Sequence, residues 1–295
     1  GIIRKHKTLF GVALLVTVLS LWSGLSWRNR QERMRIQRLT DEFDLLKPAK
    51  DLTPEDFGFV PQEPGRGPAA PSSGLRPHYD TYIDRVAVPY DSKDKPDASP
   101  LYGENHLLHE LSSGKSFVLL GQPTDGKSRT LYEVLRCMHG YLVLRPHVKH
   151  HPSPDALALV AGKKVVVVLN ELNSYVNATV DLVALCAALR RQGGTFVVAA
   201  ECRDGPELNA VREATGTTLR KFYDDIPLKL ALRRPTEEDK ARLLAAIGKS
   251  SAPDSAARFP TLGSICMDDA LKYQRARFEN LPIVQQDCLR AMQLL

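Results

Sequence analysis

The distribution of apolar and polar positions predicts strands that alternate with helices through the central part of the chain. Five short apolar runs lie at residues 116–120, 141–144, 164–169, 195–200 and 226–232. Apolar runs without alternation are typical of strands buried on both faces of a parallel sheet. Helix-length connections between them imply right-handed crossovers. We therefore expect an α/β fold in which helices cover both faces of a parallel five-stranded sheet.

A glycine loop follows the first of these strands and precedes a helix predicted from Leu131, Val134 and Leu135. The loop fits the pattern G-x-x-x-x-G-K-[ST], the Walker A signature of a phosphate-binding loop. Its eight residues are Gly121, Gln122, Pro123, Thr124, Asp125, Gly126, Lys127 and Ser128. Glycine permits the close backbone approach and the positive φ angles with which such a loop wraps a polyphosphate. The order strand, loop, helix favours a nucleotide site over an ordinary glycine-rich turn.

The polar residues at the end of this loop have distinct chemical roles in that interpretation. Lys127 supplies a charge to the β- and γ-phosphates, and Ser128 supplies a hydroxyl ligand to Mg²⁺. Arg129 follows directly and completes the predicted cofactor-binding set. The N-terminus of the helix adds its dipole and free N–H groups. The predicted ligands are therefore a nucleotide and Mg²⁺.

The apolar run at 164–169 ends in a second pair of candidate residues, Asn170 and Glu171. In nucleotide-hydrolysing folds one acid at this edge holds a Mg²⁺-bound water, and the next polarises the attacking water. Glu171 occupies the position of the catalytic base. Asn170 stands where the first acid is usual, so it would contact the metal through water and contribute no charge. The pair favours nucleotide binding over turnover.

The fourth apolar run leads into Glu201, Cys202 and Arg203, again at the edge where open α/β sheets bind ligands. Two interpretations of Arg203 remain open: a sensor of the γ-phosphate, or an ordinary surface charge. Polar residues at the tips of strands beside the loop strand indicate the additional-strand class of P-loop NTPase folds. We expect a three-layer sandwich with strand order 5-1-4-3-2. This domain would span residues 79–233, and a small helical region would follow at 234–295.

The N-terminal residues 1–27 show a different pattern. Residues 8–27 carry no charge and are rich in Leu and Val, and as a helix they are long enough to cross a bilayer core of about 30 Å. Trp22 and Trp27 lie toward one end, where interfacial aromatic residues are common. A cleaved signal peptide is the alternative, but the length of the run and the basic stretch after it favour an anchor. We expect a single transmembrane helix.

Charge and chemistry together predict the orientation of this anchor. Five arginines follow the span within residues 28–38, against three basic residues before it, and the positive-inside rule places the richer side in the cytoplasm. Nucleotide and Mg²⁺ are cytoplasmic as well. The expected localisation is therefore the membrane, single-pass, with the C-terminal domain in the cytoplasm.

Two segments connect the anchor to the folded domain in this scheme. Residues 28–60 are a basic juxtamembrane segment, expected either as a helix over 28–48 that contacts lipid or a second copy, or as a solvated spacer. Residues 61–78 are rich in Pro, Gly, Ala and Ser, which predicts a flexible linker that sets the reach of the domain. At the other end an apolar face still runs at Leu295, so we expect a longer protein to continue beyond it.

Composition narrows the class of partner. The net charge of +6 is modest and much of the excess lies near the anchor, which favours a membrane surface and gives no reason to expect nucleic acid. The five cysteines are scattered and form no C-x-x-C pair, so neither a zinc site nor a disulfide framework is indicated.

Residues 79–295 resemble the STAND class of signal-transduction ATPases, in particular the bacterial modules often found upstream of tetratricopeptide repeats. The matching segments are 121–130, 165–175, the strand ending at Arg203, 232–236 and 259–264. The resemblance implies ATP as the nucleotide, a switch between closed and open states, and a homo-oligomer or a downstream interaction domain as partner. Asp125 and Asn170 depart from the family pattern, and both changes would weaken Mg²⁺–nucleotide binding or slow hydrolysis.

Two functions of different classes follow from these residues. The first is a membrane-anchored, cytoplasm-facing ATP-binding P-loop NTPase that acts as a nucleotide-dependent regulatory switch, with Glu171 positioning water and Arg203 sensing the γ-phosphate. The second is a non-hydrolysing nucleotide-binding scaffold, which Asn170 favours. Phosphate transfer to a small molecule is disfavoured because no acceptor pocket or lid signature is visible. The residues leave open whether the chain is an ATPase.

Overall fold

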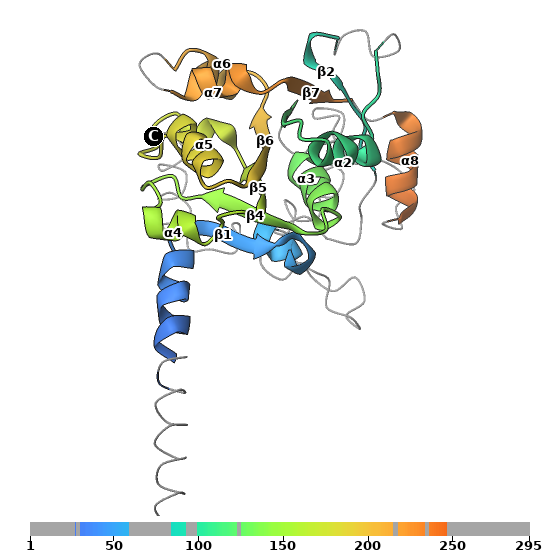
Figure 1. Ribbon diagram of the computed structural model, residues 1–295. Helices are drawn as coiled ribbons and strands as arrows, with labels where there is room; N and C mark the ends of the chain where they lie inside the picture. The colour runs from blue at the N-terminus through green and yellow to red at the C-terminus, as the bar shows by residue number, and fades with distance from the viewer. Residues whose placement is uncertain are drawn as a thin grey trace, which may run out of the picture.

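The computed structural model describes residues 27, 30–58, 84–92, 99–122, 125–214, 218–233 and 236–246. Within them, seven strands form one sheet with the order β1-β4-β5-β6-β3-β7-β2 (Figure 1). The strands are β1 (Phe43–Pro48), β2 (Ala87–Pro89), β3 (Phe117–Gly121), β4 (Tyr141–Pro146), β5 (Lys164–Leu169), β6 (Thr195–Arg203) and β7 (Leu228–Leu232). The five central strands are parallel, and each outer strand is antiparallel to its neighbour.

The predicted order of the parallel strands is confirmed. Counted along the chain from the strand before the glycine loop, β3, β4, β5, β6 and β7 lie side by side in the order 5-1-4-3-2. The predicted number of strands is wrong, because the sheet has two more. β1 adds to the outer edge of β4, and β2 adds to the outer edge of β7. Both additions satisfy backbone groups that an open parallel sheet would leave unpaired at its edges.

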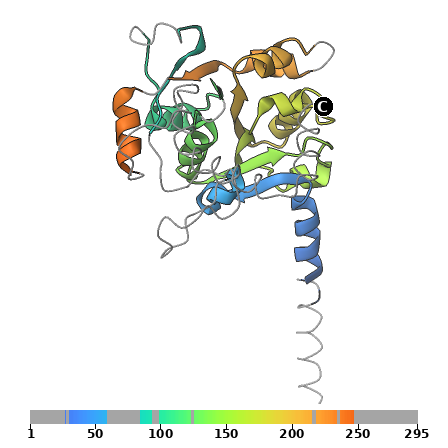
Figure 2. The ribbon, with the colours of Figure 1, turned by 180° about the vertical axis from the view of Figure 1, so that it is seen from behind.

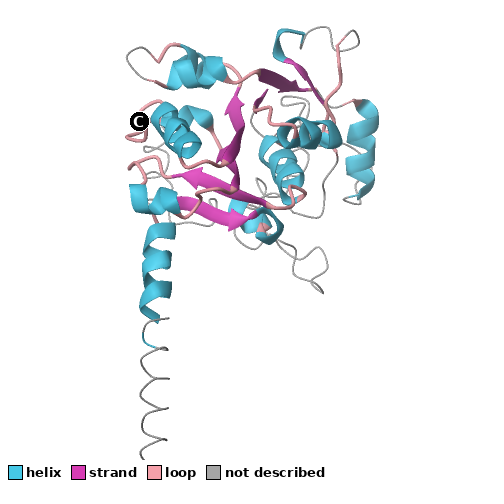
Figure 3. Cartoon of the chain, in the orientation of Figure 1, coloured by secondary structure: helices cyan, strands magenta, loops and turns pink. Residues whose placement is uncertain are grey.

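Helices lie on both faces of this sheet, so the predicted three-layer arrangement is confirmed (Figure 3). Successive residues of β3 point to opposite faces. Val118 and Leu120 join the apolar cluster on one face, and Phe117 and Leu119 join the cluster on the other. The helices are α2 (Glu104–Ser112), α3 (Lys127–Arg136), α4 (Pro154–Ala158), α5 (Leu182–Arg191), α6 (Pro206–Arg212), α7 (Leu219–Asp225) and α8 (Glu237–Ala246).

The expectation of a helix over 28–48 is wrong in its C-terminal part. Residues 30–40 are helical, but residues 43–48 form β1, in which Leu46 lies opposite Leu144 of β4. The chain then continues through two short 3₁₀ helices, η1 (Ala49–Asp51) and η2 (Pro54–Phe57). Leu45 and Phe57 are buried in the same apolar cluster as the residues of α3. Residues 43–58 are therefore part of the folded domain and not a juxtamembrane spacer.

The Pro- and Gly-rich residues 61–78 lie outside the described residues, but the elements on either side of them do not. η2 precedes them and contacts α3, and β2 follows them and pairs with β7 in the same sheet. This stretch therefore connects two parts of one domain, and it does not lie between an anchor and that domain. The predicted span of residues 8–27 lies outside the described residues except for Trp27, and no described helix is long and apolar enough to cross a membrane.

Two helices, α6 and α7, lie between β6 and β7, and α8 follows β7. α6 and α7 are separate helices, and residues 214–218 between them are rich in Thr and Gly, which disfavour helix. Two reciprocal hydrogen bonds between Thr236 and Asp239 hold the start of α8. The Asp239 N–H donates to Thr236 Oγ1 at 3.1 Å, and the Thr236 N–H donates to the Asp239 carboxylate at 2.9 Å. Residues 247–295, with the predicted helical stretches, lie outside the described residues.

Candidate functional site

The glycine loop connects β3, whose five residues are all buried, to the start of α3. Gly126 has a φ angle of 92°, a left-handed conformation that glycine adopts without strain. Gly121 meets a different requirement, since a Cβ there would lie 2.8 Å from Oδ2 of Asp125. That carboxylate accepts the N–H of Gln122 at 2.5 Å and so holds the first turn of the loop. Pro123 and Thr124 lie outside the described residues.

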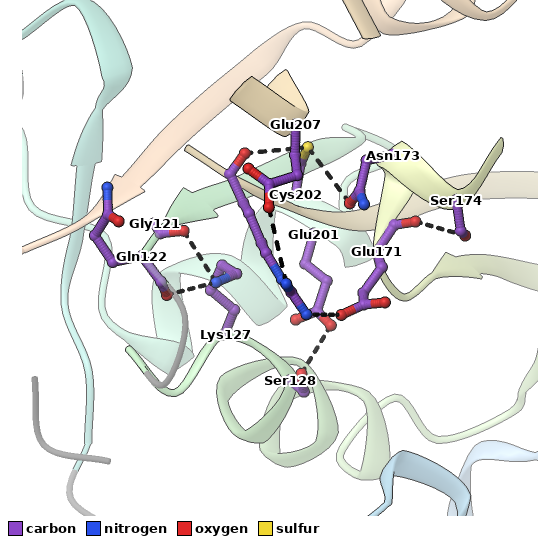
Figure 4. Close-up of polar contacts among 11 residues, drawn as sticks. Gly121, Gln122, Lys127, Ser128, Glu171, Asn173, Ser174, Glu201, Cys202 and Glu207 are labelled. Atoms are coloured by element: carbon purple, nitrogen blue, oxygen red, sulfur yellow. Dashed lines mark hydrogen bonds and ion pairs between the residues drawn. The ribbon is translucent and has the colours of Figure 1, made fainter. Parts of the chain in front are cut away.

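Lys127 is the first residue of α3, and its side chain folds back over the loop (Figure 4). Its Nζ donates to the carbonyl oxygens of Gly121 at 3.0 Å and Gln122 at 2.8 Å. Burial lowers the pKa of Lys127, while the nearby carboxylates of Glu201 and Asp125 act in the opposite direction. The lysine is thus a buried cation whose hydrogen bonds go to neutral carbonyls.

Ser128 and Glu201 connect α3 to β6. The Ser128 hydroxyl donates to Oε1 of Glu201 at 2.7 Å, and Glu201 is only 2% exposed. The second carboxylate oxygen, Oε2, is buried and has no partner among the described residues. Burial raises the pKa of Glu201, and the Ser128 hydrogen bond and the charge of Lys127 oppose that shift. The apolar run at 195–200 marks only part of this strand, since β6 continues through Glu201 to Arg203.

Asn170 follows β5 directly, and its side-chain oxygen is also buried without a partner among the described residues. Leu169 pairs with Ala200 in the β5–β6 register, so Asn170 and Glu201 are the next residues along two neighbouring parallel strands. Two unpartnered side-chain oxygens therefore come from neighbouring positions on adjacent strands. Buried polar atoms are nearly always paired in native proteins, so an unpaired oxygen indicates a missing ligand or water.

Glu171 and Arg203, the predicted catalytic pair, are brought together. Arg203 Nη2 lies 2.6 Å from Glu171 Oε1, and both side chains are partly exposed. Asp204, the next residue after Arg203, donates its N–H to the carbonyl of Gly121 at 3.1 Å, which fixes the end of β6 beside the loop. Arg203 therefore lies at the site and is not an isolated surface charge. Its role as a γ-phosphate sensor stays a prediction.

The backbone at Glu171 is unusual. Its φ angle of 57° makes it the one non-glycine residue with positive φ within the described ranges. Ser174 holds this turn, since its N–H and its hydroxyl both donate to the Glu171 carbonyl at 2.8 Å. A left-handed glutamate costs about 1 kcal/mol or more, so the surrounding structure must enforce it.

Arg129 points away from the loop. Its guanidinium pairs with Glu133 one turn further along α3, at 2.6 Å, and Glu133 also pairs with Arg136. In this arrangement Arg129 is not directed at the nucleotide site. Its predicted contact with a nucleotide therefore stays a prediction.

The oxygen atoms near the loop match the chemistry of Mg²⁺, which prefers hydroxyl, carboxylate and amide oxygens. Ser128, Asn170 and Glu201 offer one of each, and two of these groups carry an unpartnered buried oxygen. Within the described residues no group of three or more His, Cys, Asp or Glu side chains is arranged to hold a metal alone. A divalent ion here would need water or phosphate oxygens to complete its shell, as Mg²⁺ in nucleotide sites usually does.

Comparison with known proteins gives matches to solved structures of low sequence identity. No family model and no curated protein matches the chain. One similar solved structure is the ORC2 protein of Aeropyrum pernix in ADPNP–ADP complexes, with 15% identity over 48% of this chain and 49% of that one and a TM-score of 0.36. Another is a single-substitution variant of Thermotoga maritima RuvB, with 14% identity over 70% of each chain and a TM-score of 0.39. A structure concerned with katanin self-assembly has 14% identity over 57% of this chain and 64% of that one, with a TM-score of 0.32.

The class of the protein rests on its own geometry and not on those matches. The parallel order 5-1-4-3-2, the glycine loop between β3 and α3, and a lysine at the first position of α3 are together the arrangement of P-loop NTPases. The fold and the loop of this chain therefore resemble those of P-loop NTPases.

Proposed function

We propose that this chain binds ATP with Mg²⁺ at the 121–128 loop and uses the bound nucleotide as a regulatory switch. One observation carries the proposal. Lys127 is a buried cation at a helix start, and its hydrogen-bond partners are the neutral carbonyls of Gly121 and Gln122. A buried charge is stable only with a matching partner, and a phosphate is a better partner for an ammonium than two carbonyls.

The residues around the loop have separate tasks in this proposal. Lys127 exchanges its loop carbonyls for phosphate oxygens, and the free N–H groups at the start of α3 point at the same anion. Mg²⁺, when bound, neutralises charge on the β- and γ-phosphates. Glu171 accepts a hydrogen bond from the attacking water once Arg203 leaves it for the γ-phosphate. The pair at 2.6 Å therefore keeps the base occupied until a nucleotide arrives.

A non-hydrolysing scaffold is the second candidate, and two observations favour it. Asn170 is neutral at the position of the first acid, and Glu171 is already neutralised by Arg203. In a scaffold the nucleotide would stabilise the domain and would not turn over. Release of phosphate from bound ATP in Mg²⁺ separates the two candidates.

Membrane anchorage through residues 8–27, with this domain in the cytoplasm, is a further part of the proposal. It rests on the length of the uncharged run and on the arginines that follow it. The regulatory role, and a homo-oligomer or a downstream domain as partner, rest on the resemblance to STAND ATPases.

The test measures the affinity of the full chain for ATP by calorimetry, with Mg²⁺ and with EDTA. Wild type is compared with Lys127→Ala and with Lys163→Ala. Lys163 is a matched control because it is an exposed lysine that precedes the first residue of β5, at the edge of the sheet away from the loop. A charge-assisted hydrogen bond contributes about 1.5–3 kcal/mol, so Lys127→Ala should weaken ATP binding roughly tenfold to a hundredfold. Lys163→Ala should bind as wild type does.

The outcomes are distinct. Equal affinities for all three proteins, or no binding by wild type, would refute a nucleotide function for the loop. Binding that depends on Lys127 supports it, and phosphate release then shows whether the chain is an ATPase or a scaffold.

A further inference from the structure

We propose that Glu201 of β6 supplies the carboxylate ligand of the metal site. In the usual P-loop pattern this carboxylate comes from the preceding strand, β5, where this chain has the neutral Asn170. The inference rests on the proposed nucleotide function. It assigns a metal-binding role to a residue that the loop motif does not include.

The sheet register makes this exchange geometrically simple. Leu169 of β5 pairs with Ala200 of β6, so Asn170 and Glu201 are the next positions on two adjacent parallel strands. Side chains at matched positions of neighbouring strands lie on the same face of the sheet. On β3, Glu201 pairs with Leu119, which belongs to the apolar cluster under α3. Glu201 therefore lies on the face of the sheet on which α3 places Ser128.

The contacts of Glu201 leave one coordination position open. Its Oε1 accepts the Ser128 hydroxyl at 2.7 Å, and its Oε2 is buried with no partner among the described residues. Ser128 is the residue whose hydroxyl the loop motif assigns to Mg²⁺. The unpartnered oxygen of Asn170 comes from the adjacent strand end. Figure 4 shows the Ser128 hydroxyl and the Glu201 carboxylate together beside the phosphate loop, and the register places the Asn170 amide on the neighbouring strand.

A purely structural role accounts poorly for this carboxyl group. Burying an ionised carboxylate is unfavourable by several kcal/mol, and even a neutral polar group with an unpaired atom costs roughly 1–3 kcal/mol. Glutamine would accept the same Ser128 hydrogen bond without a charge. A divalent cation is the partner that would make a buried carboxylate favourable here.

The experiment compares ATP affinity in Mg²⁺ with ATP affinity in EDTA, using the full chain and calorimetry. The proteins are wild type, Glu201→Gln, Asn170→Ala, and the double variant Glu201→Gln with Asn170→Asp. The quantity of interest is the ratio of the two affinities, because it reports the metal and is independent of turnover. Electron paramagnetic resonance of Mn²⁺ with ATP gives a second readout of the same site.

Glu201→Gln should reduce the Mg²⁺-to-EDTA ratio roughly tenfold to a hundredfold, the usual range for losing a group that supports a bound metal. Asn170→Ala should reduce it less. The double variant should recover much of the ratio, because it returns the acid to β5. If Glu201→Gln does not fold, Glu201→Asp replaces it. Aspartate keeps the charge on a side chain that is shorter by one methylene group. This variant should give a Mg²⁺-to-EDTA affinity ratio between those of wild type and Glu201→Gln.

An unchanged ratio in Glu201→Gln, or a greater loss in Asn170→Ala, would overturn the inference and leave nucleotide binding intact. A wild-type protein that binds ATP equally in Mg²⁺ and EDTA would do the same. A wild-type protein that binds no ATP under either condition would overturn both this inference and the proposed function.

Discussion

Charged residues around α3 form a cluster that is separate from the phosphate loop. Glu133 pairs with Arg129 and Arg136, and Glu104 of α2 lies close enough for its pKa to be affected by all three. Burial raises the pKa of Glu104 to about 7, and the charge of Glu133 adds to the shift. An acid whose pKa is higher in the folded protein than the ordinary 4.5 destabilises that protein when it ionises.

This shift predicts how stability depends on pH. The unfolded chain loses the Glu104 proton near pH 4.5 and the folded protein near pH 7, so the contribution of Glu104 to stability falls across that interval and stays low above it. Glu104→Gln should remove this fall. Urea denaturation of both proteins through the interval should show wild type losing stability relative to the variant as pH rises. Glu238→Gln, at an exposed position of α8, is the control and should follow wild type. A constant difference between wild type and Glu104→Gln would contradict the prediction.

Some site residues could be predicted from the sequence and others could not. The difference depends on whether a motif or a strand end marks the residue in its own stretch of sequence. Lys127, Ser128, Glu171 and Arg203 were predictable because a motif or a strand end marks each of them, and the structure brings them together. Glu201 was not, because only pairing with β3 shows that β6 continues past residue 200. The direction of the Arg129 side chain was equally hidden, since it depends on Glu133 one turn away.

At the scale of elements, β1 and η2 cover part of the core that the parallel strands leave open. Phe57 of η2 is buried, with its ring 5.6 Å from the ring of Tyr132 on α3. The guanidinium of Arg145 also lies over the Phe57 ring, 5.4 Å from its centroid. This element therefore contributes to the stability of the helix that carries Lys127 and Ser128.

Removal of the Phe57 ring should destabilise the whole domain. Phe→Ala in a packed core typically costs about 3–5 kcal/mol, so Phe57→Ala should lower the free energy of unfolding by that order. Leu101→Ala is the matched control, because Leu101 is a large apolar residue that is 48% exposed, and it should change stability by less than about 0.5 kcal/mol. Chemical denaturation of the full chain measures both. Equal effects would mean that residues 43–58 do not belong to the cooperative unit.

Elements in the sheet interior could be predicted, whereas those at its edges could not. β3, β5 and β6 are continuous apolar runs because both of their faces are covered. β1 has the sequence FDLLKP, whose polar positions match an edge strand but also extend the helical pattern before it. β2 has only three residues, too few for a periodic signal. An edge strand is defined by its neighbour, and that information is not local in the sequence.

For the whole molecule, the position of β1 changes the expected distance between the N-terminal apolar run and the domain. The helix of residues 30–40 leads directly into the sheet and extends away from it (Figures 1 and 2). Its eleven residues span roughly 16 Å. If residues 8–27 cross a bilayer, the domain would lie close to the lipid headgroups, with the arginines of this helix between them.

A charge inside the apolar run tests this arrangement. An arginine near the centre of a membrane helix costs about 2.5–3.5 kcal/mol or more on insertion, so Val16→Arg should move much of the full chain from alkali-washed membranes into the soluble fraction. Ile36→Arg is the matched control, since Ile36 is exposed on the helix outside the run, and it should leave the distribution unchanged. Full membrane retention of Val16→Arg, or absence of wild type from membranes, would contradict anchorage by residues 8–27.

The left-handed backbone at Glu171 has a consequence for how this protein could change over time. Glycine would adopt the same φ angle of 57° without strain, so the most stable sequence at this turn lacks the carboxylate. Selection for thermal resistance alone would therefore tend to remove the acid, whereas selection for turnover would keep it. Laboratory evolution toward heat tolerance should reach glycine at residue 171 early, and, if the proposed function holds, the resulting lineage would bind nucleotide without hydrolysing it.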